Sequence, residues 1–305
     1  MSIATVIVTY NRLTLLKECL EAVRAQSLKS DKIIIVNNNS TDGTAEYLST
    51  VDDERVDCVN LEENIGGAGG FSYGMKKAVQ EGYDYVWIMD DDSIPQINAL
   101  CNLSKAFSLA DNVGFAASKV IWTDGMPHKM NIAEIKIMSR DYTDIYNTYS
   151  REDIPAFLCT YASFVSLLID TKVIRKIGLP IKEFFIWSDD VEYIERIRNN
   201  GYIGLYIDNS VVLHKTPTNY VSKPQFATGA IAWKFYYGAR NTTYLKRRHY
   251  KKGKLLLWLS LINRYRVFVH RVNKCADKKG IPELKRQFRK GLWDGLSFNP
   301  DIEML

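Results

Sequence analysis

Residues 85–92 constrain the fold of this chain more than any other part of its sequence. Five apolar or aromatic residues are followed there by three consecutive carboxylates, Asp90, Asp91 and Asp92. The apolar run predicts a buried strand, and open α/β sheets place their ligands at the carboxyl ends of such strands. Three carboxylates at this point need a counter-charge, which a divalent cation held together with substrate phosphates supplies. A solvated acidic turn before a helix is the alternative, because Asp is also a good helix cap.

Polar residues follow two further predicted strands and point to the same edge of the sheet. Residues 3–9 and 32–36 are β-branched runs, and the leucine spacing in residues 13–23 predicts an amphipathic helix between them. The first run leads into Tyr10 and Arg12, and the second leads into the polar stretch 37–43. The hydrogen-bonding edges of a nucleotide fit such loops, although turn and capping chemistry alone also explains them.

A glycine-rich stretch follows the third predicted strand, residues 55–61. Residues 64–71 hold four glycines within five positions and precede a predicted helix at residues 73–81. Glycine lets the backbone approach a bulky ligand and present N–H groups to phosphate, although a flexible loop is also possible. The spacing matches neither GxGxxG nor a P-loop, which excludes a Rossmann dehydrogenase and a P-loop NTPase.

Together these segments predict a doubly wound α/β sheet with a nucleotide site across its edge. Four strands alternate with helices, and each strand ends in polar residues. Residues 114–121 and 164–169 predict further strands. Between them, residues 122–155 are polar, aromatic and irregular, as expected of an insertion that covers a substrate.

A second acidic cluster, Asp189 and Asp190, follows the aromatic residues 184–187 and opens a predicted helix. Such a setting gives a partly dry pocket, in which one carboxylate can act as a general base. An acidic helix cap is the alternative. His214 follows the strand-like run 210–213, where it is either a structural histidine or a ligand that completes the coordination of a metal.

Composition and charge divide the chain near residue 225. Its 305 residues, 46% apolar and 25% charged, suffice for one large domain at residues 1–225 with an appendage at residues 226–305. The net charge is +5, and the excess of Lys and Arg gathers at residues 240–290. There, Arg240 could neutralise a diphosphate, and the basic run 246–252 predicts a solvated face. Residues 255–271 predict a helix that either binds anionic lipid or packs on the main domain.

Cysteine usage and the N-terminus predict a cytoplasmic protein. The five cysteines are odd in number and form no CxxC pair, which excludes a disulfide framework and a zinc knuckle. The N-terminus lacks a secretory pattern, and no run approaches the roughly 18 apolar residues of a membrane span. Nucleic acid is not an expected partner, because the basic residues gather in one terminal region rather than around an aromatic platform.

Several motifs resemble those of one family, the inverting glycosyltransferases of family 2 with the GT-A fold. Residues 6–12 and 36–44 resemble the first two sheet-edge loops of that family. Residues 64–71 with Asp90, Asp91 and Asp92 resemble its branch of bacterial galactofuranosyl- and rhamnosyltransferases. Further segments match the same branch along nearly the whole chain, namely residues 187–193, His214, residues 236–241 and residues 291–296.

The resemblance implies a role for each candidate site residue. Asp90 and Asp92 would bind a divalent metal, Mn²⁺ or Mg²⁺, with His214 as the additional ligand. Asp190 would be the catalytic base beside Asp189, and Trp187 and Glu192 would contact the acceptor or the sugar. The nucleotide and donor would be bound by Thr9, Tyr10, Arg12, Asn37, Asn38, Asn64, Gly66, Gly67, Gly70, Phe71, Asp90, Asp91 and Arg240. Asn37 departs from the pattern, because the family usually has Asp there.

The resemblance also implies a reaction. The expected donor is UDP-galactofuranose, and the expected acceptor is a hydroxyl of a lipid-linked or growing bacterial surface polysaccharide. Transfer of rhamnose from dTDP-rhamnose is the nearest alternative, followed by a nucleotidyltransferase or a non-catalytic protein that binds sugar nucleotides. With its basic C-terminal region, the protein is expected at the inner face of the bacterial cell membrane, attached peripherally to anionic lipid.

Overall fold

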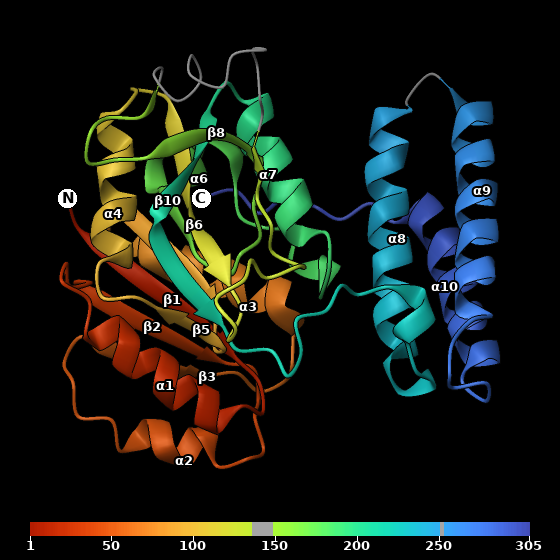
Figure 1. The fold of residues 1–305 in the computed structure, drawn as a ribbon, viewed down its shortest axis with the longest axis horizontal. Helices are drawn as coiled ribbons and strands as arrows, with labels where there is room; N and C mark the ends of the chain where they lie inside the picture. Colours follow the sequence, from red (N-terminus) through yellow and green to blue (C-terminus); the bar gives the residue numbers. More distant parts are fainter. Residues whose placement is uncertain (136–148, 251–252) are drawn as a thin grey trace.

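A mixed sheet organises the fold of residues 1–135, 149–250 and 253–305, which the computed structural model describes (Figure 1). The strands are β1 (Ile3–Thr9), β2 (Lys32–Asn37), β3 (Val56–Asn60), β4 (Tyr85–Asp90), β5 (Ser93–Pro95), β6 (Val113–Ile121), β7 (Glu134–Ile135), β8 (Ala156–Tyr161), β9 (Leu167–Asp170) and β10 (Ile203–His214). Their order is β3-β2-β1-β4-β9-β6-β10-β8-β7, with β5 paired to β10. Strands β3, β2, β1 and β4 are parallel, whereas β9 is antiparallel to both of its neighbours. This sheet confirms the predicted fold class.

Two hydrophobic cores lie on the two faces of the sheet. Helices α1 (Leu13–Arg24) and α4 (Ala99–Lys105) pack on one face, and α2 (Thr44–Ser49) lies at its edge. Helices α3 (Gly66–Gln80), α6 (Thr171–Ile177) and α7 (Asp189–Asn199) pack on the other face. All seven residues of β1 are buried, because both faces of this central parallel strand are covered. The polar residues of these segments follow the buried strands, so they lie at the carboxyl ends of β1, β2 and β4.

Three further helices form a layer of their own, namely α8 (Ala232–His249), α9 (Lys254–Val272) and α10 (Ile281–Ser297). In Figure 1 they lie to one side of the sheet, and they share a core that includes Phe235, Leu261, Phe268 and Phe288. Within the described residues, no helix combines the length and the apolar character that a membrane crossing requires. The domain boundary near residue 225 remains a prediction.

The C-terminal tail leads back from the helical layer to the sheet (Figure 1). The N–H of Leu179 donates to the carbonyl oxygen of Glu303 at 2.9 Å. The carboxylate of Glu303 also forms an ion pair with Lys76 of α3 at 2.6 Å. The helical layer is thus connected to the sheet both through the chain that enters α8 and through the tail that leaves α10.

The glycine-rich stretch differs from its prediction. It forms the first turns of α3, which begins at Gly66, rather than a loop before a helix at residues 73–81. A Cβ atom at Gly70 would lie 2.6 Å from Cγ1 of Val8, so this glycine lets α3 approach β1 closely. Gly70 therefore has a role in helix packing, and its predicted role in donor binding remains a prediction.

Two sequence-based predictions fall partly outside the described residues. The predicted insertion at residues 122–155 is described at its two ends, because residues 136–148 lie outside the described part. The basic run 246–252 is described only as far as Tyr250.

Candidate active site

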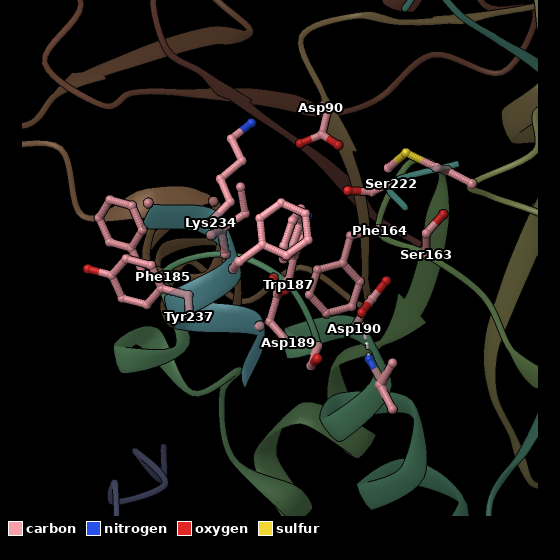
Figure 2. Close-up of a pocket in the computed structure, with 18 of the residues that line it drawn as sticks. Asp90, Ser163, Phe164, Phe185, Trp187, Asp189, Asp190, Ser222, Lys234 and Tyr237 are labelled. Atoms are coloured by element: carbon pink, nitrogen blue, oxygen red, sulfur yellow. Dashed lines mark hydrogen bonds between the residues drawn. The ribbon is translucent and has the colours of Figure 1, made fainter. Parts of the chain in front are cut away.

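A cavity of about 1160 Å³ lies where the ends of β1 and β4 face α7 and α8. Both acidic clusters line it. Figure 2 shows Asp90 on one side, Asp189 and Asp190 on the opposite side, and Trp187 between them in this view. Two groups of carboxylates that are far apart in the sequence therefore share one cavity.

The first acidic cluster is held by the residues that follow β1. The Asp91 carboxylate accepts hydrogen bonds from Oγ1 of Thr9 at 2.7 Å and from the N–H of Tyr10 at 3.3 Å. The guanidinium of Arg12 donates to Asp91 at 3.3 Å and also contacts Asp92. Burial lowers the pKa of Arg12, but the neighbouring carboxylates outweigh burial and raise that pKa above its usual value. Thr9 and Arg12 thus fix the geometry of the acidic cluster.

Asp90, Asp92 and His214 form a ligand set that fits a divalent cation. One ligand atom from each residue lies within 4.8 Å of the other two. Burial and the two adjacent carboxylates raise the pKa of Asp90 well above its usual value, because its charged form lacks sufficient counter-charge. Carboxylate oxygens with an imidazole nitrogen suit Mn²⁺ or Mg²⁺. A cation at this position would supply the missing positive charge.

His214 is oriented for metal binding by Asn131. Its Nδ1 lies 2.9 Å from Oδ1 of Asn131, and its Nε2 lies 2.9 Å from Oδ1 of Asp92. Because amide and carboxylate oxygens only accept, both ring nitrogens donate in these contacts, and Nε2 would bind a cation in place of its hydrogen. The ring of His128 lies 4.5 Å from that of His214, and burial followed by the His214 charge lowers the pKa of His128 to about 4. His128 is therefore a neutral neighbour.

The second acidic cluster opens α7. The hydroxyl of Tyr161, at the end of β8, donates to Oδ2 of Asp190 at 2.6 Å. Burial raises the pKa of Asp190, and the Tyr161 hydrogen bond opposes this shift. Burial and the charge of Asp190 raise the pKa of Asp189 to about 7. Carboxyl groups with raised pKa values suit proton transfer near neutral pH.

The segment that leads into this cluster has an unusual backbone. Phe185, Trp187 and Ser188 have φ angles of +64°, +65° and +68°, a region that is costly for residues other than glycine. Asn241 of α8 is fully buried, and its amide nitrogen donates to the carbonyl oxygens of residues 184, 186 and 187 at 2.9, 3.1 and 2.8 Å. Helix α8 thus holds the segment that presents Asp189 and Asp190.

Most residues of the predicted site line the cavity. They are Thr9, Tyr10, Arg12, Asn38, Asn64, Gly66, Gly67, Phe71, Asp90, Asp91, Asp92, Trp187, Asp189, Asp190 and His214. Gly66 has a φ angle of +76°, and a side chain there would collide with the backbone of Phe185. Glycine at this position therefore lets α3 and the segment before α7 meet at the rim of the cavity.

Three more predicted residues have other partners, in addition to Gly70. The amide of Asn37 donates to Asn60 at 2.7 Å and accepts from the N–H of Ser40 at 3.0 Å, so it orders the loop after β2. Glu192 is 1% exposed and forms ion pairs with Arg196 at 2.7 Å and Arg248 at 2.8 Å. Neither residue lines the cavity, so their predicted contacts with the nucleotide and the sugar remain predictions.

Arg240 likewise has partners outside the cavity lining, and its predicted contact with the diphosphate remains a prediction. Its guanidinium donates to the carbonyl oxygens of Glu183 and Phe184 and lies 4.0 Å from the ring centroid of Phe298. The cation that α8 presents to the cavity is Lys234 instead. Figure 2 shows its side chain extending toward the part of the cavity where Asp90 lies. Burial and the nearby charge of Arg12 lower the pKa of Lys234, so two cations face this end of the cavity.

The sequence interpretation missed Lys234, Tyr161, Asn131 and Asn241. Lys234 and Asn241 lie on the same helix as Arg240. Which of these side chains faces the cavity depends on how the helix is rotated about its axis, and the sequence does not define that rotation. Tyr161 and Asn131 lie at or beside the irregular segment 122–155 and belong to no recognisable motif. No single-sequence signal identifies these two residues.

Comparisons with known proteins agree with this geometry. The chain is 28% identical over 205 residues to the galactofuranosyltransferase GlfT1 of Mycolicibacterium smegmatis, an alignment that covers 65% of this chain and 66% of that protein. It therefore spans just under two thirds of the length of this curated relative. The family model of glycosyl transferase family 2 matches residues 4–177.

Two solved structures share the fold. The crystal structure of GalNAc-T7 with UDP, GalNAc and Mn²⁺ superposes with a TM-score of 0.58 at 14% identity, over 91% of this chain and 56% of that one. The mannosyltransferase PcManGT from Pyrobaculum calidifontis, in complex with GDP-Man and Mn²⁺, gives a TM-score of 0.52 at 15% identity, over 93% and 73%. Because the family match covers more than half of the chain, the protein belongs to glycosyl transferase family 2.

Proposed function

We propose that the protein is a metal-dependent, inverting glycosyltransferase that transfers galactofuranose from UDP-galactofuranose to a hydroxyl group of a lipid-linked bacterial surface polysaccharide. One observation carries the proposal: the ligand set around Asp90 and the carboxylates Asp189 and Asp190 line the same cavity. Similarity to a galactofuranosyltransferase supports the choice of donor.

In the proposed reaction the two acidic clusters have separate tasks. The acceptor hydroxyl attacks the anomeric carbon, its oxygen forms the new glycosidic bond, and the bond to the diphosphate oxygen breaks. Asp190 takes the proton of the hydroxyl, and UDP leaves with the electron pair of the broken bond. A single base without a covalent intermediate leads to inversion of the anomeric configuration.

The other end of the cavity would bind the donor. Asp90, Asp92 and His214 would hold Mn²⁺ or Mg²⁺, which when bound neutralises diphosphate oxygens. Arg12 and Lys234 add positive charge at the same end. Trp187, next to Asp189 in the cavity, offers an aromatic face for a sugar ring.

A donor screen tests this proposal. Purified protein is incubated with UDP-galactofuranose or dTDP-rhamnose, an acceptor mixture of lipid-linked saccharides, and either Mn²⁺ or EDTA. We expect transfer from UDP-galactofuranose with Mn²⁺, loss of transfer with EDTA, and an inverted linkage by NMR. A preference for dTDP-rhamnose would favour the rhamnosyltransferase alternative. Binding of UDP without any transfer would favour a non-catalytic sugar-nucleotide-binding protein.

We also propose that the protein acts at the cytoplasmic face of the cell membrane, bound through α9. One face of this helix packs in the helical core through Leu257, Leu261, Phe268 and Val272. The opposite face exposes large apolar side chains at the spacing of a single helical stripe: Leu255, Trp258, Leu259 and Ile262. Exposed Arg266 and Lys254 lie on the same helix, as is typical of peripheral helices that bind anionic lipid.

Vesicle co-sedimentation tests the membrane proposal. Wild-type protein is expected to sediment with phosphatidylglycerol vesicles and to remain in solution with phosphatidylcholine vesicles. Leu255→Ser combined with Leu259→Ser should reduce binding, because both side chains belong to the exposed stripe. Val191→Ser, an exposed apolar change on α7, is the matched control. Equal binding of wild type and the double variant would refute the assignment.

A further inference from the structure

A second region of the cavity lies against α9, beyond the two acidic clusters. Residues 264, 267, 268 and 271 are spaced by three or four positions, so they share one face of the helix. All four line the cavity. Arg264 and Arg271 therefore face the same space, about 10 Å apart along the helix axis.

Arg264 has no carboxylate partner among residues 1–135, 149–250 and 253–305. Its Nη2 donates to the carbonyl oxygen of Gly238 at 3.2 Å, and its guanidinium lies 5.5 Å from the ring centroid of Phe288. Its Nη1 is buried and has no hydrogen-bond partner among the residues that the structure describes. Burial lowers the pKa of Arg264 to about 10, so the side chain remains charged at neutral pH. A buried donor of this kind is costly unless an acceptor occupies the space beside it.

An aromatic wall connects Arg264 with the second acidic cluster. The ring centroid of Trp187 lies 5.3 Å from that of Phe235, which lies 5.6 Å from that of Phe268. Gly238, whose carbonyl accepts from Arg264, packs on Trp187, since a Cβ atom there would lie 2.7 Å from Cε3 of the indole. A ligand that reaches Asp190 along this wall therefore also passes Arg264.

We propose that Arg264 and Arg271 form an anion subsite for the phosphate or diphosphate that joins the acceptor saccharide to its lipid, an inference that rests on the proposed function. The guanidinium fork matches the oxygens of a phosphate group. The donor diphosphate has its own cations at the other end of the cavity, Arg12 and Lys234. The exposed apolar stripe of α9 lies on the opposite face of the helix and does not line this part of the cavity.

Binding of farnesyl diphosphate tests the subsite without any knowledge of the acceptor sugar. Isothermal titration is carried out with saturating UDP and Mn²⁺, so that the donor end of the cavity is filled. Wild-type protein is expected to bind one molecule. Arg264→Gln and Arg271→Gln should each weaken binding about tenfold to a hundredfold, the worth of one charged hydrogen bond. Arg289→Gln, the same change at an exposed position of α10 outside the cavity lining, should bind as wild type does.

Titrations with two further compounds, inorganic pyrophosphate and farnesol, identify which part of the ligand is recognised. Inorganic pyrophosphate that binds as tightly as farnesyl diphosphate would overturn the acceptor assignment in favour of a free anion. If farnesol binds as tightly as farnesyl diphosphate, the site recognises the apolar chain and the anion assignment is wrong. Because Arg271 is exposed, Arg271→Gln should fold even if Arg264→Gln does not, and unchanged binding by folded Arg271→Gln would refute its role. A different result would contradict the proposed function alone: farnesyl diphosphate binds and the two arginine variants weaken its binding, but the protein transfers no sugar.

Discussion

Replacement of Asn241 should damage catalysis from a position behind the active site. Its buried amide group joins α8 to the carbonyl oxygens of residues 184, 186 and 187. The same segment holds Phe185, Trp187 and Ser188 at positive φ angles, each of which costs about 1 to 3 kcal/mol. These hydrogen bonds are therefore needed to keep the segment in a conformation that its own residues disfavour.

The structure gives the size of the effect. An amide group has two hydrogens, so Asn241→Ala removes about two hydrogen bonds and leaves carbonyl oxygens unsatisfied, at roughly 1 to 3 kcal/mol each. We expect the free energy of unfolding to fall by about 2 to 5 kcal/mol. Asn241→Asp is the sharper variant, because it keeps the shape but turns an oxygen toward the same carbonyl groups.

The assay separates catalysis from binding. Because Asn241 positions the segment before Asp189 and Asp190, we expect kcat to fall on the order of 100-fold, the effect of a misplacement of about 1 Å. The affinity for UDP should change little, because the proposed function places UDP at the loops after β1 and β2. Thr243→Val is the matched control, since Thr243 is also buried on α8 and its hydroxyl donates within the helix, to the carbonyl oxygen of Ala239. A kcat for Asn241→Ala or Asn241→Asp equal to that of Thr243→Val would refute the positioning role.

Three further changes give distinct expected outcomes. Lys234→Met should raise the KM for the donor about tenfold or more and leave the KM for the acceptor nearly unchanged, because the proposed diphosphate site loses one cation. An unchanged donor KM would favour Arg240 as the residue that neutralises the diphosphate. Tyr161→Phe should move the acidic limb of the profile of kcat/KM against pH to higher pH, because the hydroxyl that stabilises the Asp190 carboxylate is gone, and an unmoved limb would exclude Asp190 as the titrating base. Asp189→Asn should stabilise the protein at pH 8 and not at pH 3: the folded-state pKa of about 7 exceeds the unfolded value, so the wild type loses stability as pH rises through this interval. Thermal unfolding should show a gain of about 4 kcal/mol at pH 8, the free energy that corresponds to this difference in pKa. No gain would mean that folding does not disfavour the charged form of Asp189.

The parts of the fold that follow from local pattern were predictable from the sequence. Apolar runs ending in polar residues correctly predicted β1, β2, β3 and β4, because a buried parallel strand reads as a continuous apolar segment. The cluster of Asp90 and Asp92 was predictable for the same reason, since the end of a strand fixes where the next residues lie.

Contacts between distant segments were less accessible to sequence reasoning. Glu192 looked like a site residue because it lies beside Asp190, although its spacing of four from Arg196 already favours an ion pair along the helix. Arg240 and Lys234 lie on one helix, and the choice between them depends on how α8 is rotated against the sheet, which the periodicity of α8 does not define. Tyr161 reaches Asp190 because α7 packs against β8, a contact between segments that are distant in the sequence.

A paired measurement on Asp190→Asn tests most directly whether the two acidic clusters serve one reaction. UDP binding in the presence of Mn²⁺ and transfer from UDP-galactofuranose are measured on the same preparation. We expect UDP affinity within about threefold of wild type, and transfer reduced at least about 100-fold, the usual contribution of a general base. Transfer at a rate near that of the wild type would contradict a shared site in which one cluster holds the donor and the other accepts the proton.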